Sequence, residues 1–501
     1  YISNHDEDTI KRIAFDLTGF QHLVIRGEET QFLFHTDVIP FYLHACEDIT
    51  IEGVKIDYVR PGYSEGKIRE LEPQRMVVEI DPTEYPYEIF NGRLYFRGEN
   101  FFNEMTYGCL EMDGKRHAPV CQGHDIGFNR PYPWSYGAVF DELEPGVVEI
   151  RLLGDKEFLK TSQVGNNLIF RHHARTHPAF YVTYSKDIVL QDIVLYHCVG
   201  MAVIAQFSEN LTMRRFDVRR HPEKKRIFTA TADGFHLIYC RGKIQIQDCL
   251  LENQLDDPLN VHGIYGRIHK IISEREVMVE LVEGMQKGVP LGKKGEQFRI
   301  IDNETMLEIE TVRLEEHQML NGDYQYMKFD RPVTEWKESF VVENTDYVPD
   351  VLVEGCTFQN NRARGLLLTS AGDVLVRKNV FKTAGSAILI EGDSNYWFES
   401  GATRHIVVEQ NQFIDCAYVP DWGNAPIQVS PSAKKYVQGQ RYHKYLELRD
   451  NEFYCFDDRI LWAQNIEEIH MSGNKIFQTD TFPPMEGERF YLDGVLEFEE
   501  K

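Results

Sequence analysis

Residues 350–381 read DVLVEGCTFQNNRARGLLLTSAGDVLVRKNVF, and the first nine and last nine of them share one pattern. DVLVEGCTF (350–358) aligns with DVLVRKNVF (373–381), 23 positions later. In both segments apolar residues alternate with polar ones over a short run, as expected of a strand that buries one face. A repeat of this length built from short strands is typical of a solenoid in which each repeat forms one coil.

The same spacing recurs along the chain. Further pairs 23 positions apart are Ile188 with Leu211, Asp233 with Asp256, and Leu446 with Ile469. The alignment also places asparagines at one repeat position, with Cys249 and Cys356 as their equivalents: Asn379, Asn411, Asn451 and Asn474. Polar side chains stacked at a turn can hydrogen-bond along the stack. We therefore predict a parallel β-helix with coils of about 23 residues; a β-sandwich with coincidental spacing is the alternative.

Two regions with a different strand pattern interrupt this repeat. From Ser64 the strands are longer and are separated by hairpin signals such as Asn91-Gly92, and a second such region follows Gly263. Asn-Gly between alternating apolar residues is the strongest short-range hairpin signal. We therefore predict two antiparallel, barrel-like insertions in the β-helix. The predicted parts are 1–63 (N-terminal coils), 64–180 (first insertion), 181–263 (central coils), 264–344 (second insertion) and 345–501 (C-terminal coils).

Composition excludes some classes of protein. The 501 residues carry a formal net charge of −25, which disfavours a nucleic-acid partner because proteins that bind phosphate backbones concentrate positive charge. No run of 18 apolar residues is present, so we expect no membrane span. The nine cysteines lack metal-ligand spacing, and most lie in apolar runs, which favours buried thiols.

The segments TADGFH (231–236) and LDDPLNVHG (255–263) contain the candidate catalytic residues. The repeat places Asp233 and Asp256 on neighbouring coils, about 4.8 Å apart, with Asp257 beside them. Three carboxylates this close cannot all ionise freely, so the pKa of at least one should rise. A carboxylic acid beside an ionised carboxylate is what glycoside hydrolysis needs. Asp-Asp-Pro is also an ordinary turn sequence, but the polar residues around it favour a site.

Other side chains near these aspartates are candidates for binding a sugar. Arg364 occupies the repeat position of Asp257 one coil later, and Trp422 offers a flat apolar face to a sugar ring. Trp134, in the first insertion, is a further candidate for reaching over the site. The full set of predicted sugar-binding residues, apart from Trp134, is His236, Asn260, His262, Arg364, Glu391 and Trp422.

These two segments, together with IPFYLHACEDITIEGVKIDYVRP (39–61), resemble glycoside hydrolase family 110 over most of the chain. The family comprises bacterial exo-acting α-1,3-galactosidases that act on the blood group B determinant or on linear Galα1-3Gal. The resemblance implies a right-handed parallel β-helix with inserted β-barrels and an inverting mechanism that uses no metal and no cofactor. It also implies that Asp233, Asp256 and Asp257 are the catalytic aspartates, with Asp256 as general acid and the other two positioning and activating water.

The sequence is compatible with two alternatives. One is a β-helix polysaccharide lyase or pectin-type hydrolase, although a lyase typically needs a Lys or Arg base, which the LDDPLNVHG segment lacks. The other is a solenoid that binds carbohydrate without catalysis. The expected partner is a carbohydrate with terminal α-galactose, and an oligomer is compatible with the sequence. The chain begins at Tyr1 without a leader, and we expect an exported bacterial protein of the periplasm or cell surface.

Overall fold

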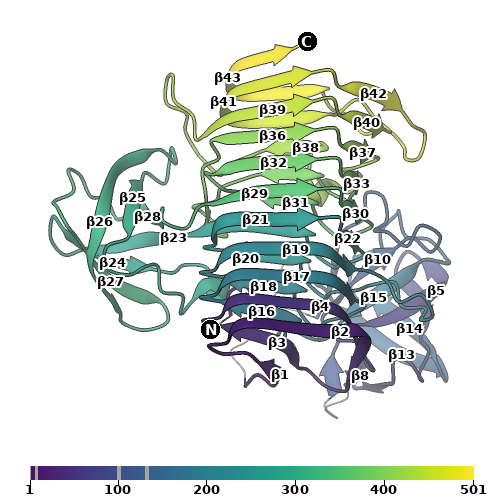
Figure 1. The fold of residues 1–501 in the computed structure, drawn as a ribbon. Helices are drawn as coiled ribbons and strands as arrows, with labels where there is room; N and C mark the ends of the chain where they lie inside the picture. The colour runs from purple at the N-terminus through teal and green to yellow at the C-terminus, as the bar shows by residue number, and fades with distance from the viewer. Residues whose placement is uncertain (1, 6–9, 99–102, 130–134) are drawn as a thin grey trace.

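The computed structural model describes residues 2–5, 10–98, 103–129 and 135–501, and nearly all regular structure in them is β-strand. The strands stack along one axis, with the N-terminus near the bottom of the stack and the C-terminus at its top (Figure 1). Successive coils pair in parallel, so the predicted parallel β-helix is confirmed. The described residues also include two 3-10 helices, η1 (Gly284–Gln286) and η2 (Pro420–Trp422).

Three columns of parallel strands form the faces of the β-helix. The first column contains β2 (Gln21–Phe34), β4 (Glu47–Tyr58), β17 (Lys186–Leu195), β19 (Glu209–Val218), β21 (Arg241–Gln247), β29 (Pro349–Glu354), β32 (Asp373–Arg377), β36 (His405–Glu409), β39 (His443–Arg449), β41 (Leu461–Ser472) and β43 (Phe490–Glu500). The second contains β1 (Ile13–Asp16), β3 (Ile39–His44), β16 (Phe180–Thr183), β18 (Val203–Gln206), β20 (Phe235–Ile238), β23 (Leu259–Ile271), β31 (Leu366–Leu368), β34 (Ile388–Ile390) and β38 (Ile427–Val429), and the start of β41 joins it. The third contains β22 (Leu250–Glu252), β30 (Thr357–Gln359), β33 (Val380–Lys382), β37 (Gln412–Ile414), β40 (Glu452–Cys455) and β42 (Lys475–Gln478).

The 23-residue spacing is correct for three of the four predicted pairs and wrong for the fourth. The correct pairs follow the registers Ile188 with Leu211, Val351 with Val374, and Leu446 with Ile469. Between β20 and β23, however, Phe235 pairs with Leu259, which is 24 positions later. The turn before β23 therefore holds one extra residue. Asp233 lies over Asp257, and Asp256 lies one residue earlier in that turn.

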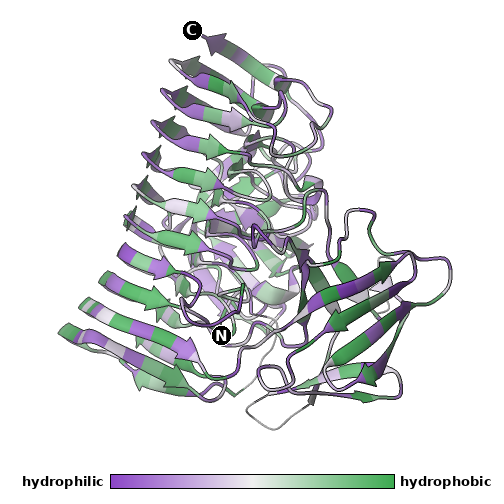
Figure 2. Ribbon diagram, turned by 90° about the vertical axis from the view of Figure 1, so that its right-hand side faces the viewer, coloured by the Kyte–Doolittle hydropathy of each residue, from purple (hydrophilic) through white to green (hydrophobic). Residues whose placement is uncertain are grey.

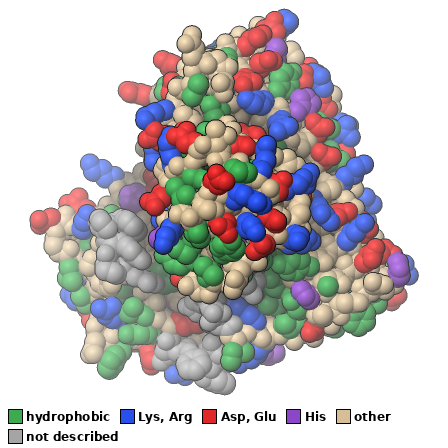
Figure 3. Space-filling view, turned by 90° about the vertical axis from the view of Figure 1, so that its left-hand side faces the viewer, with side chains coloured by type: hydrophobic (Ala, Val, Ile, Leu, Met, Phe, Trp, Pro, Cys, Tyr) green, Lys and Arg blue, Asp and Glu red, His purple; other side chains and the backbone are tan. Residues whose placement is uncertain are grey.

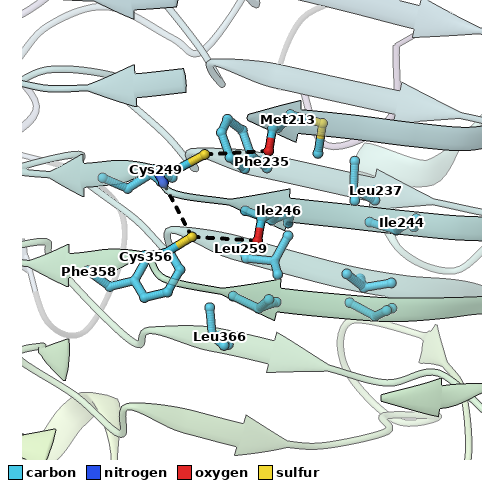
Figure 4. Close-up of a cluster of buried hydrophobic side chains, with 14 of the residues drawn as sticks. Met213, Phe235, Leu237, Ile244, Ile246, Cys249, Leu259, Cys356, Phe358 and Leu366 are labelled. Carbon is cyan, nitrogen blue, oxygen red and sulfur yellow. Dashed lines mark hydrogen bonds between the residues drawn. The ribbon is translucent and has the colours of Figure 1, made fainter. Parts of the chain in front are cut away.

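Apolar side chains from every coil fill the interior of the β-helix (Figure 4). Phe358, Phe381, Phe413 and Phe453 stack on one another with ring centroids 5.2, 5.0 and 4.8 Å apart. These distances match the spacing of neighbouring strands, so one aromatic ring per coil fills the same place in each layer. Figure 2 shows hydrophilic and hydrophobic segments alternating along the column strands.

The predicted asparagine ladder is present at the turn between the first and third columns. The amide oxygen of Asn411 accepts from the backbone N–H of Asn379, and Asn451 and Asn474 continue the series. The Asn379 oxygen accepts from the Cys356 N–H at 2.8 Å. One coil earlier, the Cys356 sulfur accepts from the Cys249 N–H at 3.4 Å (Figure 4). Each ladder asparagine also donates to a backbone carbonyl, so these buried polar groups are satisfied.

The first insertion is a mostly antiparallel sheet that packs beside the lower coils (Figure 1). Its main sheet contains β5 (Ser64–Glu72), β6 (Arg75–Glu79), β10 (Gly108–Met112), β11 (Ile126–Phe128), β12 (Ser135–Tyr136), β13 (Ala138–Glu144), β14 (Val147–Leu152) and β15 (Asn167–Arg171). A small sheet of β7 (Tyr87–Phe90), β8 (Arg93–Arg97) and β9 (Asn103–Met105) accompanies it. Its own apolar core includes Met76, Phe128 and Phe140.

The second insertion is a closed barrel that projects from the opposite side of the stack (Figure 1). Its further strands are β24 (Glu276–Glu280), β25 (Gln297–Ile301), β26 (Glu308–Met319), β27 (Tyr324–Phe329) and β28 (Val341–Asn344). Strand β23 begins in the second column of the β-helix and continues into the barrel, where it pairs with β24 and β28. Closure removes exposed strand edges. Seen from that side, acidic and basic side chains are interspersed over the surface (Figure 3).

Two further features concern the cysteines and the length of the helices. The nine cysteines are free thiols, and eight are buried. Within the described ranges, no helix is long and apolar enough to cross a membrane.

Candidate active site

The candidate aspartates lie where strands of the second column begin. Asp233 precedes β20, and Asp257 precedes β23, two residues before each strand. On β20, Phe235 and Leu237 point into the core, so His236 between them points outward. The parallel register therefore gathers turn carboxylates and outward-facing polar side chains at one end of the same face.

The three aspartates form a compact carboxylate trio. Carboxylate oxygens of Asp233, Asp256 and Asp257 lie within 4.8 Å of one another. The Asp233 and Asp257 side chains are 5% and 3% exposed, whereas that of Asp256 is 16% exposed. Asp256 is therefore the member of the trio that a bound molecule reaches first.

Guanidinium groups surround the trio. Arg364, on the coil after Asp257, donates from its backbone N–H and from Nη2 to that carboxylate at 2.7 and 2.9 Å. Asp256 lies 3.4 Å from Nη1 of Arg175 and 3.5 Å from Nη1 of Arg362. The site is thus a cluster of opposite charges that is largely shielded from water.

The first insertion holds part of this arginine cluster in place. Its residue Asp125 forms ion pairs with Arg362 at 2.7 Å and with Arg171, at the end of β15, at 2.9 Å. Burial opposes ionisation of Asp125, but the two guanidinium groups hold its pKa at about 2. The ring of Trp422 lies under Arg362, 4.1 Å from the guanidinium carbon.

The trio does not carry three negative charges at neutral pH. Burial and the neighbouring Asp256 charge raise the pKa of Asp233 to about 8. Burial alone would raise the pKa of Asp256, but Arg362 and Arg175 bring it below its ordinary value. Burial likewise raises the pKa of Asp257, and the Arg364 ion pair opposes that rise. At least one proton therefore resides in the trio, and because Asp257 already accepts two hydrogen bonds from Arg364, Asp233 is its best-placed holder.

A pair of histidines extends the site along the same face. Asp233 hydrogen-bonds to Nδ1 of His236, and Nε2 of His236 lies 2.8 Å from Nε2 of His262. Glu399, on β35 (Glu399–Ser400), lies 3.5 Å from the same His262 nitrogen and accepts from Asn260 at 3.4 Å. Burial raises the pKa of Glu399 to about 7. These side chains form a continuous line of polar groups that begins at Asp233.

Two groups of side chains have donor atoms close enough together to surround a cation. One is the aspartate trio, and the other is His236, His262 and Glu399. In both, the donor atoms already bond to one another or to Arg364, and the arginines around the trio oppose a further positive charge. We therefore assign neither group a metal.

Comparison with known proteins is consistent with this arrangement. Residues 64–168 match the family model described as GLAA-B beta-barrel domain I, and residues 276–338 match GLAA-B beta-barrel domain II. The chain is 30% identical to Alpha-1,3-galactosidase B of Bacteroides thetaiotaomicron, over 97% of this chain and 78% of that protein. It is 32% identical to Alpha-1,3-galactosidase A of Shewanella woodyi, over 96% of this chain and 78% of that protein. The chain belongs to glycoside hydrolase family 110.

This family 110 enzyme is a glycoside hydrolase that acts on α-galactosyl glycans. Membership sets aside the lyase, the pectin-type hydrolase and the non-catalytic solenoid as its function. Among solved structures, a family 28 exopolygalacturonase of Yersinia enterocolitica is similar over 94% of this chain and 72% of that one, at 8% identity and a TM-score of 0.35. A likeness that distant says nothing about activity.

Most of the predicted site residues of the family 110 enzyme come together on one face. His236, Asn260, His262 and Arg364 lie beside the trio. Glu391 directly follows β34, and burial raises its pKa to about 7 while Arg364 opposes the rise. Trp422 packs against Arg362 and Arg364, so its structural contact is with guanidinium groups. Trp134 lies outside the described residues.

Four charged residues of the site were not predicted from the sequence: Asp125, Arg175, Arg362 and Glu399. Arg175 contacts the trio from the segment after the first insertion's strands, and Asp125 of the insertion contacts Arg362 beside the trio. Both are far from the repeats that guided the prediction. Arg362 is two residues before Arg364, so the alignment of coils that indicated Arg364 also indicated the segment that contains Arg362. Glu399 follows a loop with no repeat equivalent, and nothing in its local sequence marks it.

Proposed function

We propose that the enzyme is an exo-acting, inverting α-1,3-galactosidase that removes terminal α-1,3-linked galactose from blood group B type glycans or from linear Galα1-3Gal. The observation that carries this proposal is the buried aspartate trio, in which Asp233 favours the protonated form and Asp256 the ionised form. Coupled carboxyls that share a proton can supply the acid and the base of glycoside hydrolysis, and the roles proposed below require that proton to lie on Asp256, not Asp233, when the bond breaks. The names of the relatives support the linkage.

In the proposed reaction Asp256 is the general acid, because it is the most exposed member of the trio and first meets a glycosidic oxygen at the site entrance. Its proton passes to the leaving oxygen as the bond from that oxygen to the anomeric carbon breaks. Asp233 and Asp257, which are more deeply buried, position a water molecule on the other side of the sugar. The water oxygen bonds to the anomeric carbon, and its proton passes to Asp233.

This reaction leaves the proton on Asp233, which is where the unliganded site favours it. Before the next cycle, Asp256 must therefore regain a proton and Asp233 must lose one. Closely coupled carboxyls titrate as a set, so binding of a neutral sugar among them redistributes the proton.

The spacing of the carboxyls makes stereochemistry a sharp test. An inverting acid and base are typically about 6.5–9.5 Å apart, and a retaining pair about 5–5.5 Å apart. In the unliganded site the nearest oxygens of the trio lie within 4.8 Å, so the inverting proposal rests on the family resemblance and requires galactose to enter between Asp256 and the other two.

We further propose that the protein is exported to the periplasm or cell surface, because its substrates are expected outside the cell. Fractionation of source cells tests this proposal.

An NMR time course tests the proposed reaction. The enzyme is incubated with Galα1-3Gal and with the blood group B trisaccharide in the presence of a chelator, and the anomeric signals of released galactose are followed. We expect β-galactose to appear first and α-galactose only by later mutarotation. Initial release of α-galactose would overturn inversion, and release from neither substrate by the folded protein would overturn the linkage assignment.

A further inference from the structure

The hydrogen-bonded line that leaves Asp233 has a fixed direction. The side chain of His262 lies 2.6 Å, through Nδ1, from the carbonyl oxygen of Gly263. A carbonyl only accepts, so Nδ1 carries the proton. Burial lowers the pKa of His262, so the ring is neutral and its Nε2 is free to accept.

The next two groups follow from this assignment. Because Nε2 of His262 accepts, Nε2 of His236 must donate across the 2.8 Å contact between the rings. Burial lowers the pKa of His236 to about 3, so its other nitrogen, Nδ1, is unprotonated and accepts in turn. Its partner there is Asp233, which must then be the protonated carboxyl. With His236 neutral, the chain of tautomers thus places the proton on Asp233.

Glu399 lies at the far end of the same line. It contacts Nε2 of His262, the atom that accepts from His236. Its side chain is 14% exposed, whereas those of His236 and His262 are 2% and 0% exposed. A proton leaving Asp233 along this line therefore moves from a closed interior toward a carboxylate that reaches solvent.

We propose that His236 and His262 relay a proton from Asp233 toward Glu399, and that Glu399 is a positioning residue that helps to free the base as each new substrate binds. The Asp233 proton passes to Nδ1 of His236 as the proton on Nε2 passes to His262. No bond between heavy atoms changes. The Asp233 carboxylate then accepts a hydrogen bond from His236, and the Glu399 carboxylate stabilises the imidazolium of His262.

This inference rests on the proposed function, in which Asp233 takes a proton from water. Charges on every side bear on the relay. The other titratable or charged groups that face it are His5, Arg175, Asp256, Asp257, Arg364 and Glu391. Of these, Glu391 is the useful comparison, because it is also a buried glutamate near Arg364 but makes no contact with either histidine in the described structure.

The first test is Glu399→Gln, measured as the pH dependence of kcat and KM on an α-galactoside. Glutamine cannot stabilise the imidazolium, so we expect kcat at neutral pH to fall about 10- to 100-fold. We expect KM to change by less than about threefold, because a relay residue acts on turnover and not on uniform binding. The acidic limb of the kcat profile should move to higher pH, since Asp233 must then lose its proton without the relay.

Electrostatics alone predicts that the acidic limb moves in the opposite direction, to lower pH. The direction of the shift therefore decides between the two explanations. Removing a nearby negative charge lowers the pKa of a carboxyl. Glu391→Gln, the matched control, should therefore leave the acidic limb in place or move it to lower pH. The relay is overturned if Glu399→Gln moves the limb in that direction too, or if it raises KM while kcat is unchanged, as expected of a residue that only binds sugar.

A second measurement does not depend on activity. The ¹⁵N chemical shifts of labelled histidines in the unliganded enzyme report which ring nitrogen carries the proton, and His262→Asn supplies the assignment. We expect the Nε2–H form of His236 and the Nδ1–H form of His262 at pH 7. An Nδ1–H form of His236 would show that Asp233 is ionised at rest and would overturn the relay. Failure to hydrolyse any galactoside would instead overturn the proposed function and leave this result intact.

Discussion

The enzyme contains two stacks of polar side chains built on the same repeat, and they differ in charge. The asparagine ladder at Asn379, Asn411, Asn451 and Asn474 is neutral, and each amide both accepts and donates along the stack. The stack at the active site runs from Asp233 to Asp257 and then Arg364, with Asp256 beside it. The first stack satisfies buried backbone groups. The second confines a proton and several charges in a place where they are not all satisfied, which is a common property of catalytic sites.

The largest expected effect comes from removing a carboxyl of the trio. Asp256→Asn and Asp233→Asn should each lower kcat on Galα1-3Gal by about 10²–10⁴-fold, the usual contribution of a general acid or base. The two should differ on an aryl α-galactoside, whose good leaving group needs little protonation. Asp256→Asn should then recover much of its activity, whereas Asp233→Asn should not. Equal recovery in both would contradict the assigned roles.

The next effect concerns the free energy of unfolding and the direction in which it changes with pH. Because the pKa of Asp233 is raised to about 8 in the folded protein, its contribution is fully present below pH about 4 and is lost as pH rises toward 8. Asp233→Asn should remove this loss, so the variant should gain stability over the parent between pH 5 and pH 8. The slope is at most about 1.4 kcal/mol per pH unit. Urea unfolding at the two pH values measures it, and a constant difference would show that Asp233 is ionised throughout.

Asp57 provides the opposite case within the β-helix. Burial opposes its ionisation, but Arg226 and Lys224 hold its pKa at about 2. Its contribution is therefore present above pH about 4 and is lost as pH falls toward 2, an effect of roughly 2 kcal/mol. Asp57→Asn should flatten the acid side of the stability profile in urea unfolding. An unchanged acid side would mean that this buried ion pair does not control acid unfolding.

Breaking the ladder should change stability without changing chemistry. Asn411→Ala leaves the Asn379 N–H without an acceptor, and each unsatisfied buried group costs about 1–3 kcal/mol. We expect a lower free energy of unfolding, measured in urea, and a kcat within about twofold of the parent. A large loss of activity in a folded Asn411→Ala protein would show that the two stacks are coupled.

The smallest effect is expected at Trp422. Its ring lies 4.1 and 5.5 Å from the guanidinium carbons of Arg362 and Arg364, a contact that contributes about 0.5–2 kcal/mol. Trp422→Leu should therefore lower kcat/KM by about 3- to 20-fold, because the guanidinium groups of the two arginines are then held less firmly in place. If KM alone rises and kcat is unchanged, the ring instead binds sugar directly, as the sequence suggested.

Much of this architecture follows from the sequence because strand spacing is a local property. The alignment of Asn379 with Asn411 predicted the ladder, and the alignment of Asp257 with Arg364 placed on neighbouring coils two side chains that the structure shows in contact. The pairing of Asp233 with Asp256 failed because one extra residue in a turn shifts the register without altering the apolar pattern. Asp125 and Glu399 could not be found in this way, since tertiary packing of insertions and loops brings them to the site. The protonation states of the site carboxyls also depend on tertiary packing, because burial and arginines that are distant in sequence set their pKa values.

The central claim is that the unliganded trio holds a proton on Asp233 at neutral pH. It is tested most directly by ¹³C NMR titration of aspartate-labelled enzyme, with Asp233→Asn used for assignment. We predict one carboxyl signal that stays in the protonated form at pH 7, titrates near pH 8 and is missing from the variant. If instead all three site carboxyls are ionised by pH 6, the proton is absent at rest, and both the proposed acid–base cycle and the relay that serves it are contradicted.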